Sequence, residues 1–220
     1  MLRKILIVLA VLIVALVVII ATRPGSFRVV RSATMAAPAA VVYAQIADFH
    51  RWDAWSPWAK LDPSMKVSFS GPASGPGAGY AWVGNDKVGE GKMLITGARP
   101  GQEVDIQLDF LKPWQATNAT TFVLEPAGPG TKVTWSMSGE SNFMAKAMSL
   151  VMDMDAMIGK DFEKGLSQMG TVAAAETKRL ADEAAKKAAE AAAAQAAADA
   201  AAAQAAAAAK PAKPAKGAKK

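Results

Sequence analysis

Cysteine is absent from this chain of 220 residues, histidine occurs once and tyrosine twice. Without cysteine the chain has no disulfide, no thiol chemistry and no thiolate ligand for zinc. The single histidine, His50, has no second histidine or cysteine with which to build a zinc site or a catalytic dyad. The sequence therefore predicts no catalytic residue, no metal site and no cofactor.

A basic face on the central part of the chain is also missing, although the formal net charge is +6. Residues 1–26 carry +3 and residues 173–220 carry +4, whereas residues 27–172 carry −1. The positive charge thus belongs to the two ends, and the centre lacks the basic patch that nucleic-acid recognition requires. We expect no specific binding of nucleic acid.

Polar residues are missing from Ile5 to Ala21, an apolar run of 17 residues. This length is at the lower end of what spans a bilayer. It exceeds the ~7–15 residue core of a signal peptide, and no small-x-small cleavage motif follows it. We expect a single-pass transmembrane anchor over residues 1–22, with residues 5–21 in the membrane, and a linker over residues 23–26.

The flanking charges bear on the orientation of this anchor. Arg3 and Lys4 favour a cytoplasmic N-terminus, which would place the rest of the chain on the extracytoplasmic (periplasmic) side. Arg23, Arg28 and Arg31 on the other flank oppose that orientation. The charges therefore favour an extracytoplasmic domain without deciding it.

Apolar residues in the centre follow the period of β-strands, with glycine- and proline-rich turns between the runs. In Val104–Phe110 apolar and polar residues alternate strictly. Short strands without intervening helices predict an antiparallel meander with one face rich in aromatic residues and methionine and one wet face. The expected strands are Phe27–Met35, Met65–Phe69, Ala78–Val83, Val88–Thr96, Glu103–Leu111, Thr117–Glu125 and Thr131–Ser138.

Helical patterns flank this meander. Pro38 stands where a helix would begin. After Gly139 the pattern predicts one helix from Asn142 to about Met154 and another from near Gly159, both lying across the apolar face of the sheet.

Alanine dominates residues 173–209. Because alanine is the strongest helix former and no stripe of large apolar residues is present, we expect a solvated helical stalk. Residues 210–220, made of lysine, proline, alanine and one glycine, are expected to be a disordered basic tail that either meets an anionic surface or only aids solubility.

Three tryptophans, Trp52, Trp55 and Trp58, stand three residues apart. On a helical turn ended by Pro57 they would form one large flat apolar surface. Two interpretations stay open: packing in the core, or lining the mouth of a binding cavity.

The segment Asp48–Trp58, the strand-helix start and the closing segment Gly159–Leu166 resemble the SRPBCC superfamily. These are the START/Bet v 1-like helix-grip proteins, often labelled polyketide cyclase/dehydrase. The resemblance covers residues 27–172 and implies an α+β fold, in which a curved antiparallel β-sheet wraps around a long C-terminal helix with an apolar cavity between them. The superfamily includes lipid carriers, cyclases, hydrolase-like enzymes and stress proteins, so it implies the fold more strongly than the activity.

We therefore expect a membrane-anchored domain that binds a small hydrophobic or amphipathic molecule, lipid-like or aromatic, without a demonstrable catalytic set. Small-molecule pockets are mostly apolar, with few polar groups. The pocket-lining candidates are Trp52, Trp55, Trp58, Tyr80, Trp82, Phe110, Trp114, Trp135, Met144 and Met148.

Two other functions remain open. An enzyme of the cyclase, dehydratase or hydrolase type would need polar groups in the cavity, for which Tyr80, Asn118 and Glu90 are the candidates. A structural cell-envelope protein is the other alternative, because the alanine-rich stalk resembles by composition the helical spacer of TolA-type envelope proteins. This alternative predicts a cavity filled by the protein's own side chains.

Overall fold

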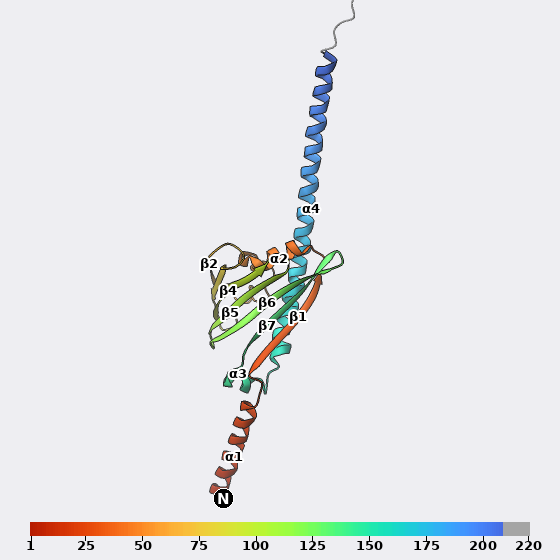
Figure 1. Ribbon diagram of the computed structural model, residues 1–220. Helices are drawn as coiled ribbons and strands as arrows, with labels where there is room; N and C mark the ends of the chain where they lie inside the picture. Colours follow the sequence, from red (N-terminus) through yellow and green to blue (C-terminus); the bar gives the residue numbers. More distant parts are fainter. Residues whose placement is uncertain (209–220) are drawn as a thin grey trace, which may run out of the picture. The chain divides into compact units, whose positions relative to one another are not determined.

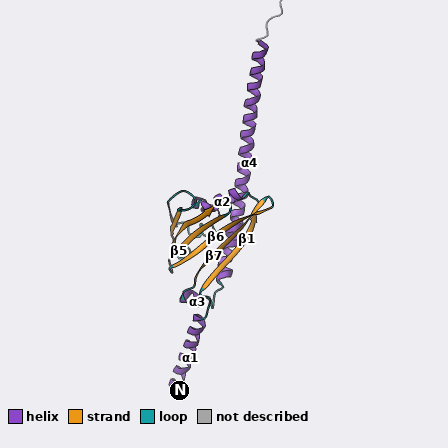
Figure 2. Cartoon of the chain, in the orientation of Figure 1, coloured by secondary structure: helices purple, strands orange, loops and turns teal. Residues whose placement is uncertain are grey.

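The computed structural model describes residues 1–208 as one sheet with helices before, within and after it (Figures 1 and 2). The predicted basic tail and the last residue of the predicted stalk lie outside the described residues. In chain order the elements are α1 (Leu2–Ala21), β1 (Ser26–Met35), α2 (Ala39–Ala47), the 3-10 helix η1 (Phe49–Ala54), β2 (Lys66–Ser70), β3 (Gly79–Val83), β4 (Glu90–Arg99), β5 (Glu103–Lys112), β6 (Ala116–Ala127), β7 (Gly130–Glu140), α3 (Phe143–Met148) and α4 (Met154–Ala208).

All seven strands pair antiparallel in one sheet of order β1-β7-β6-β5-β4-β3-β2. Strands β2 to β7 form the predicted meander, and β1 joins it beside the last strand, with Ser26 opposite Glu140. This pairing leaves β1 and β2 as the two edges of the sheet. The predicted fold class, an α+β helix grip with an N-terminal apolar helix, is confirmed.

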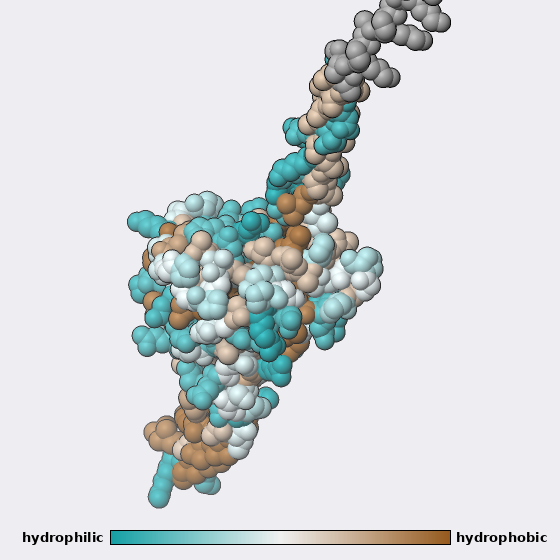
Figure 3. Space-filling view, turned by 45° about the horizontal axis from the view of Figure 1, so that its top comes forward, coloured by the Kyte–Doolittle hydropathy of each residue, from teal (hydrophilic) through white to brown (hydrophobic). Residues whose placement is uncertain are grey.

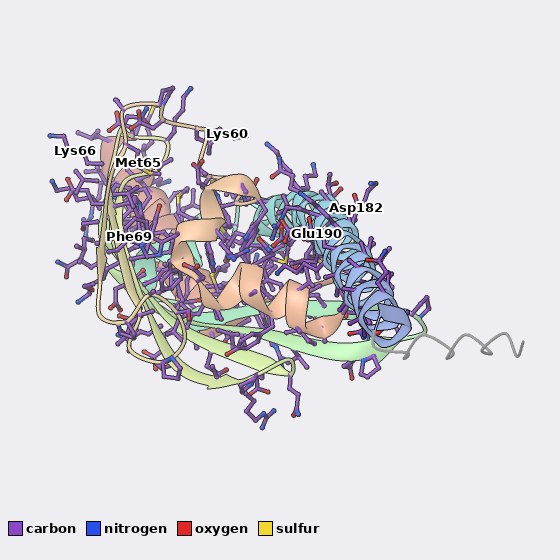
Figure 4. All side chains as sticks on the ribbon, turned by 90° about the horizontal axis from the view of Figure 1, so that it is seen from above. Lys60, Met65, Lys66, Phe69, Asp182 and Glu190 are labelled. Atoms are coloured by element: carbon purple, nitrogen blue, oxygen red, sulfur yellow. The ribbon has the colours of Figure 1, made fainter. Side chains whose placement is uncertain are left out.

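The apolar face of the sheet is covered by α2 and by the first part of α4, and side chains fill the space between them (Figure 4). The predicted alternation explains this burial. Val104 and Ile106 on β5 are buried, as are Val133, Trp135 and Met137 on β7. These positions point to one face because successive strand residues point to opposite faces.

The segment after the sheet differs from the prediction. Instead of one helix from Asn142 to about Met154, α3 ends at Met148 and α4 begins at Met154. The side chain of Asp153 accepts a hydrogen bond of 2.9 Å from the backbone N–H of Ala156 and so starts a new helix. The prediction that both helices cover the sheet is wrong for α3, which has no buried residue.

The chain divides into two compact units, Met1–Thr177 and Lys178–Lys220. The described part of the second unit is α-helical and exposed, with ion pairs one turn apart, such as Lys178 to Asp182 at 2.7 Å. Such pairs stabilise an isolated helix by only a few tenths of a kcal/mol each. Its helicity therefore rests mainly on alanine, as the composition indicates.

Candidate functional site

The covered face of the sheet carries a continuous group of five aromatic rings, the aromatic cluster: Trp52, Trp55, Phe122, Trp135 and Phe162. The ring of Phe162 on α4 lies parallel to that of Trp135 on β7, with 4.0 Å between their centroids. The ring of Phe122 on β6 stacks on that of Trp135, with 4.7 Å between their centroids. Trp52 and Trp55 are 4.7 Å apart and meet Phe122 edge-on. The cluster thus joins η1, the sheet and α4 into one core.

Hydrogen bonds fix the two η1 tryptophans to the end of α2. The indole N–H of Trp52 donates to the carbonyl of Ile46 at 2.9 Å, and that of Trp55 donates to the carbonyl of Gln45 at 3.0 Å. These carbonyls belong to the last turn of α2, where helical partners are missing. The tryptophans therefore satisfy a helix end as well as filling the core.

Two other polar atoms on the covered face are buried without a partner within residues 1–208: the indole N–H of Trp135 and the hydroxyl of Thr120. They lie on the neighbouring strands β7 and β6, where Thr120 is opposite Met137 and two residues from Phe122. Buried polar groups normally have a hydrogen-bond partner, and these two atoms are exceptions to that rule.

A groove of about 520 Å³ runs between the edge strand β1 and α4. Its volume is within the range of small-molecule sites. Met35 and Leu166 are buried and form apolar floor, while hydroxyl groups of serine and threonine stand along the walls. The complete lining is Ser32, Ala33, Thr34, Met35, Ala36, Glu163, Leu166, Ser167, Gly170, Thr171 and Ala174.

Small side chains on α4 keep this groove open. Ser167, Gly170 and Ala174 face it at intervals of three and four residues, which places them on one side of a helix. A Cβ atom added to Gly170 would lie 3.6 Å from Met35, an ordinary contact distance. A methyl group at this position would therefore just contact Met35, and larger side chains would extend into the groove.

Ion pairs of Arg31 link β1 to α4 beside the groove. Its guanidinium contacts the carboxylate of Asp155 at 2.9 Å and that of Glu163 at 2.8 Å, and donates to the backbone carbonyl of Asp155 at 3.1 Å. Gly159 makes room for this arrangement, because a Cβ atom at that position would overlap the guanidinium. The guanidinium of Arg31 holds the pKa of the Asp155 carboxyl below its ordinary value, chiefly through the hydrogen bond.

The Asp155→Asn variant is expected to lose stability in a way that depends on pH. A lowered folded-state pKa stabilises the protein at pH values above the unfolded-state pKa, and this contribution is lost as the pH falls through the folded-state value, below about pH 4. Urea unfolding of both proteins between neutral and acid pH should show a difference that shrinks toward acid. Asp161→Asn, whose side chain makes no ion pair within residues 1–208, is the control; an equal, pH-independent loss in Asp155→Asn would contradict the prediction.

A second, smaller cleft of about 230 Å³ lies by the turn that follows β2, with Phe49, His50 and Phe69 in its lining. The imidazole of His50 stacks on Phe69 with centroids 3.9 Å apart, and its Nδ1 lies 2.9 Å from Oδ1 of Asp48. Within residues 1–208, no three histidine, cysteine, aspartate or glutamate side chains gather to hold a metal ion. This cleft therefore has an aromatic wall made by Phe69 and the imidazole of His50, which also pairs with Asp48.

Residues 26–174 match the family described as polyketide cyclase/dehydrase and lipid transport. The chain belongs to this family. The match includes the sheet, α2, η1 and the part of α4 that lines the groove, and it confirms the resemblance inferred from the sequence. The family supports a domain that binds hydrophobic ligands.

Solved structures resemble the chain in fold at low identity. A protein from Rhizobium leguminosarum is 14% identical, with a TM-score of 0.50, over 66% of this chain and 93% of that one. Protein CV1439 from Chromobacterium violaceum is 14% identical, with a TM-score of 0.49, over 68% and 97%. The Mll3558 protein from Rhizobium loti is 19% identical, with a TM-score of 0.49, over 68% and 96%. Comparison with curated proteins finds no match.

The ten residues that the sequence predicts to line a pocket differ in how far they are buried. Trp52, Trp55, Trp82 and Trp135 are buried; Trp58, Tyr80, Phe110 and Met148 are partly buried; Trp114 and Met144 are exposed. None of the ten lines the groove or the smaller cleft. Their role in ligand contact stays a prediction.

Most groove residues were not predicted because they are small or polar and carry no hydrophobic signature in the sequence; the two large apolar ones, Met35 and Leu166, were not among the pocket candidates. The polar candidates for an enzyme are also separate: the carboxylate of Glu90 pairs with Lys112 at 2.7 Å, and Asn118 is buried. Burial raises the pKa of the Tyr80 hydroxyl. No hydrogen bond within residues 1–208 joins Tyr80, Asn118 and Glu90 to one another.

Proposed function

We propose that this protein is a membrane-anchored binding protein for a small amphipathic molecule with an apolar chain, which it holds in the groove between β1 and α4. The observation that carries the proposal is the groove itself, with its apolar floor, hydroxyl-bearing walls and volume of about 520 Å³. Membership of a family that includes lipid transport proteins supports it.

The groove divides into parts that suit the two ends of such a molecule. The accessible apolar surface of the groove belongs to Ala33, Ala36 and Ala174, because Met35 and Leu166 are only 2% and 1% exposed. Burial of apolar surface contributes about 25 cal/mol per Å² before the cost of ordering the ligand. Ser167 offers a hydroxyl group that both donates and accepts hydrogen bonds, whereas the hydroxyl of Thr171 donates to the backbone carbonyl of Ser167 at 3.2 Å and is left as an acceptor. An apolar chain on the floor with a neutral polar head against the hydroxyl groups uses both features.

The anchor in this proposal is α1, which is long and apolar enough to cross a membrane by length and composition. Its 20 residues span about 30 Å as a helix, the thickness of the hydrocarbon core. The groove begins at Ser32, six residues along β1 from Ser26, or about 20 Å at the rise of a strand. An extracytoplasmic domain anchored this way would present its ligand a short distance from the bilayer.

Filling the groove is expected to abolish binding. The test uses the full chain in lipid nanodiscs and a photoactivatable fatty acid, with adducts quantified by mass spectrometry. In the double variant Ser167→Phe/Thr171→Phe the two rings occupy the groove, and we expect adducts to fall by about tenfold or more, equivalent to ~1.4 kcal/mol.

Lys164→Phe is the matched control, since it adds the same ring to an exposed position of α4 outside the groove lining. Undiminished labelling of the double variant would refute the groove as the site. Adducts on peptides of the aromatic cluster, with a change in tryptophan emission, would instead support the ten candidate residues as the pocket. Absence of adducts across fatty acids, lysolipids and aromatic probes would refute ligand binding.

A second candidate function is a structural envelope protein, and the aromatic cluster favours it because the protein's own side chains fill the covered face of the sheet. In that case deletion of residues 178–220, which leaves the groove and the core intact, would produce the phenotype of the full deletion, and the groove variant would have none. The ligand-binding function predicts the reverse.

A further inference from the structure

Large apolar side chains in α3, in the turn after it and in the first turn of α4 are exposed and do not line the groove. Val151 is 80% exposed, and Phe143 and Met144 are each 54% exposed. Exposed apolar groups gathered in this way mark a contact with a partner or a membrane. The set, called here the apolar segment, consists of Phe143, Met144, Val151, Met152 and Met157.

The fold brings this segment to the C-terminal end of α1, which α3 contacts (Figure 1). Pairing of Ser26 with Glu140 places the end of β7 beside the start of β1. The backbone N–H of Ser141 then donates to the carbonyl of Gly25 at 2.9 Å, and the ammonium of Lys146 donates to that of Ala21 at 3.4 Å. The position of α3 is therefore tied to the last turn of α1.

We propose that the apolar segment inserts into the surface of the same lipid bilayer that α1 spans. The proposal rests on the anchoring stated under the proposed function. Only four residues separate α1 from β1, so the linker reaches at most about 14 Å. With α3 held against the end of α1, the apolar segment lies at the level of the lipid headgroups, where apolar side chains enter the interface.

The neighbouring charges fit this occupant better than a protein partner. Lys146 and Arg23 lie at the end of α1, where long basic side chains extend toward headgroups while their stems contact apolar surface. In Figure 3 the most hydrophobic surface of the view gathers over α1 itself, the element to which the segment is joined. The bilayer that covers α1 would cover the apolar segment as well.

The absence of cysteine allows a direct test, because any introduced cysteine is unique in the chain. The full chain is reconstituted into phosphatidylcholine/phosphatidylglycerol vesicles with a spin label at Met144→Cys or Val151→Cys. Collisions of the label with oxygen, which concentrates in lipid, are compared with collisions with a water-soluble nickel chelate. Leu12→Cys reports insertion of α1, and Leu94→Cys is the control, since it is 43% exposed and lies in the middle of β4.

We expect oxygen collisions to dominate at Met144→Cys and Val151→Cys, as at Leu12→Cys, and nickel collisions to dominate at Leu94→Cys. Nickel dominance at the two segment positions while Leu12→Cys is in lipid would overturn the inference and leave the anchor standing. Nickel dominance at all positions would overturn the inference and the anchoring together. Lipid contact at the segment with a water-exposed Leu12→Cys would also overturn the inference, because α1 would then not span the bilayer that the segment enters.

Discussion

Trp55→Ala is expected to lower the free energy of unfolding by about 3–5 kcal/mol, the usual cost of deleting a large buried aromatic side chain. Trp55 is 1% exposed and contacts Trp52, Phe122 and Trp135 in the aromatic cluster. Its removal also leaves the carbonyl of Gln45 without the indole donor. Urea unfolding of the full chain in detergent, followed by near-ultraviolet circular dichroism, measures the loss.

Trp114→Ala is the matched control because it deletes the same side chain at a position that is 63% exposed. We expect a change within about 0.5 kcal/mol, as for other surface substitutions. Similar losses in the two variants would contradict the assignment of Trp55 to the core. The comparison also separates the two sequence-based interpretations of the tryptophans, since a residue at a cavity mouth would tolerate truncation far better.

The strands could be predicted from the sequence because alternation is a local signal. Val104–Phe110 reads as a strand in isolation, and the turns around it contain glycine and proline. The sequence predicted two helices here but placed the break between about Met154 and Gly159, later than its observed position between Met148 and Met154. The position depends on a single side chain, that of Asp153, which starts the second helix inside the segment predicted as the first. One local cap decides this boundary against the periodicity of the whole segment.

The groove could not be predicted, because it arises where two distant segments fail to pack closely. Gly170 and Ser167 are unremarkable within a helix, and Thr34 is unremarkable within a strand. Only the position of β1 at the sheet edge, with α4 held beside it by Arg31, brings these small side chains together as the lining of one groove. The tryptophans gave a strong sequence signal because of their size, and that signal marked the core.

Phe162→Ala is expected to loosen α4 from the sheet, again at a cost of about 3–5 kcal/mol. Phe162 is 1% exposed and lies parallel to Trp135, so its ring is an apolar contact between α4 and β7. Lys164→Ala, an exposed position on the same helix, should have little effect. Urea unfolding as above measures both.

A double-mutant cycle with Phe162→Leu and Trp135→Leu isolates the stacking contact. For residues in direct contact we expect a coupling energy of about 0.5–1.5 kcal/mol. A coupling near zero would mean that the two rings are buried independently and that α4 is held to the sheet by other contacts, such as the ion pairs of Arg31.

Phe162→Ala also tests whether the packing of α4 against the sheet controls ligand binding. Glu163 and Leu166, which line the groove, follow Phe162 within one turn of the helix, so a loosened α4 changes the width of the groove. We expect Phe162→Ala to lower photo-labelling of the groove at urea concentrations where the protein is still folded, and Lys164→Ala to leave it unchanged. Full labelling in Phe162→Ala would show that the groove keeps its shape without the aromatic contact, and would contradict control of ligand binding by the packing of α4 on the sheet.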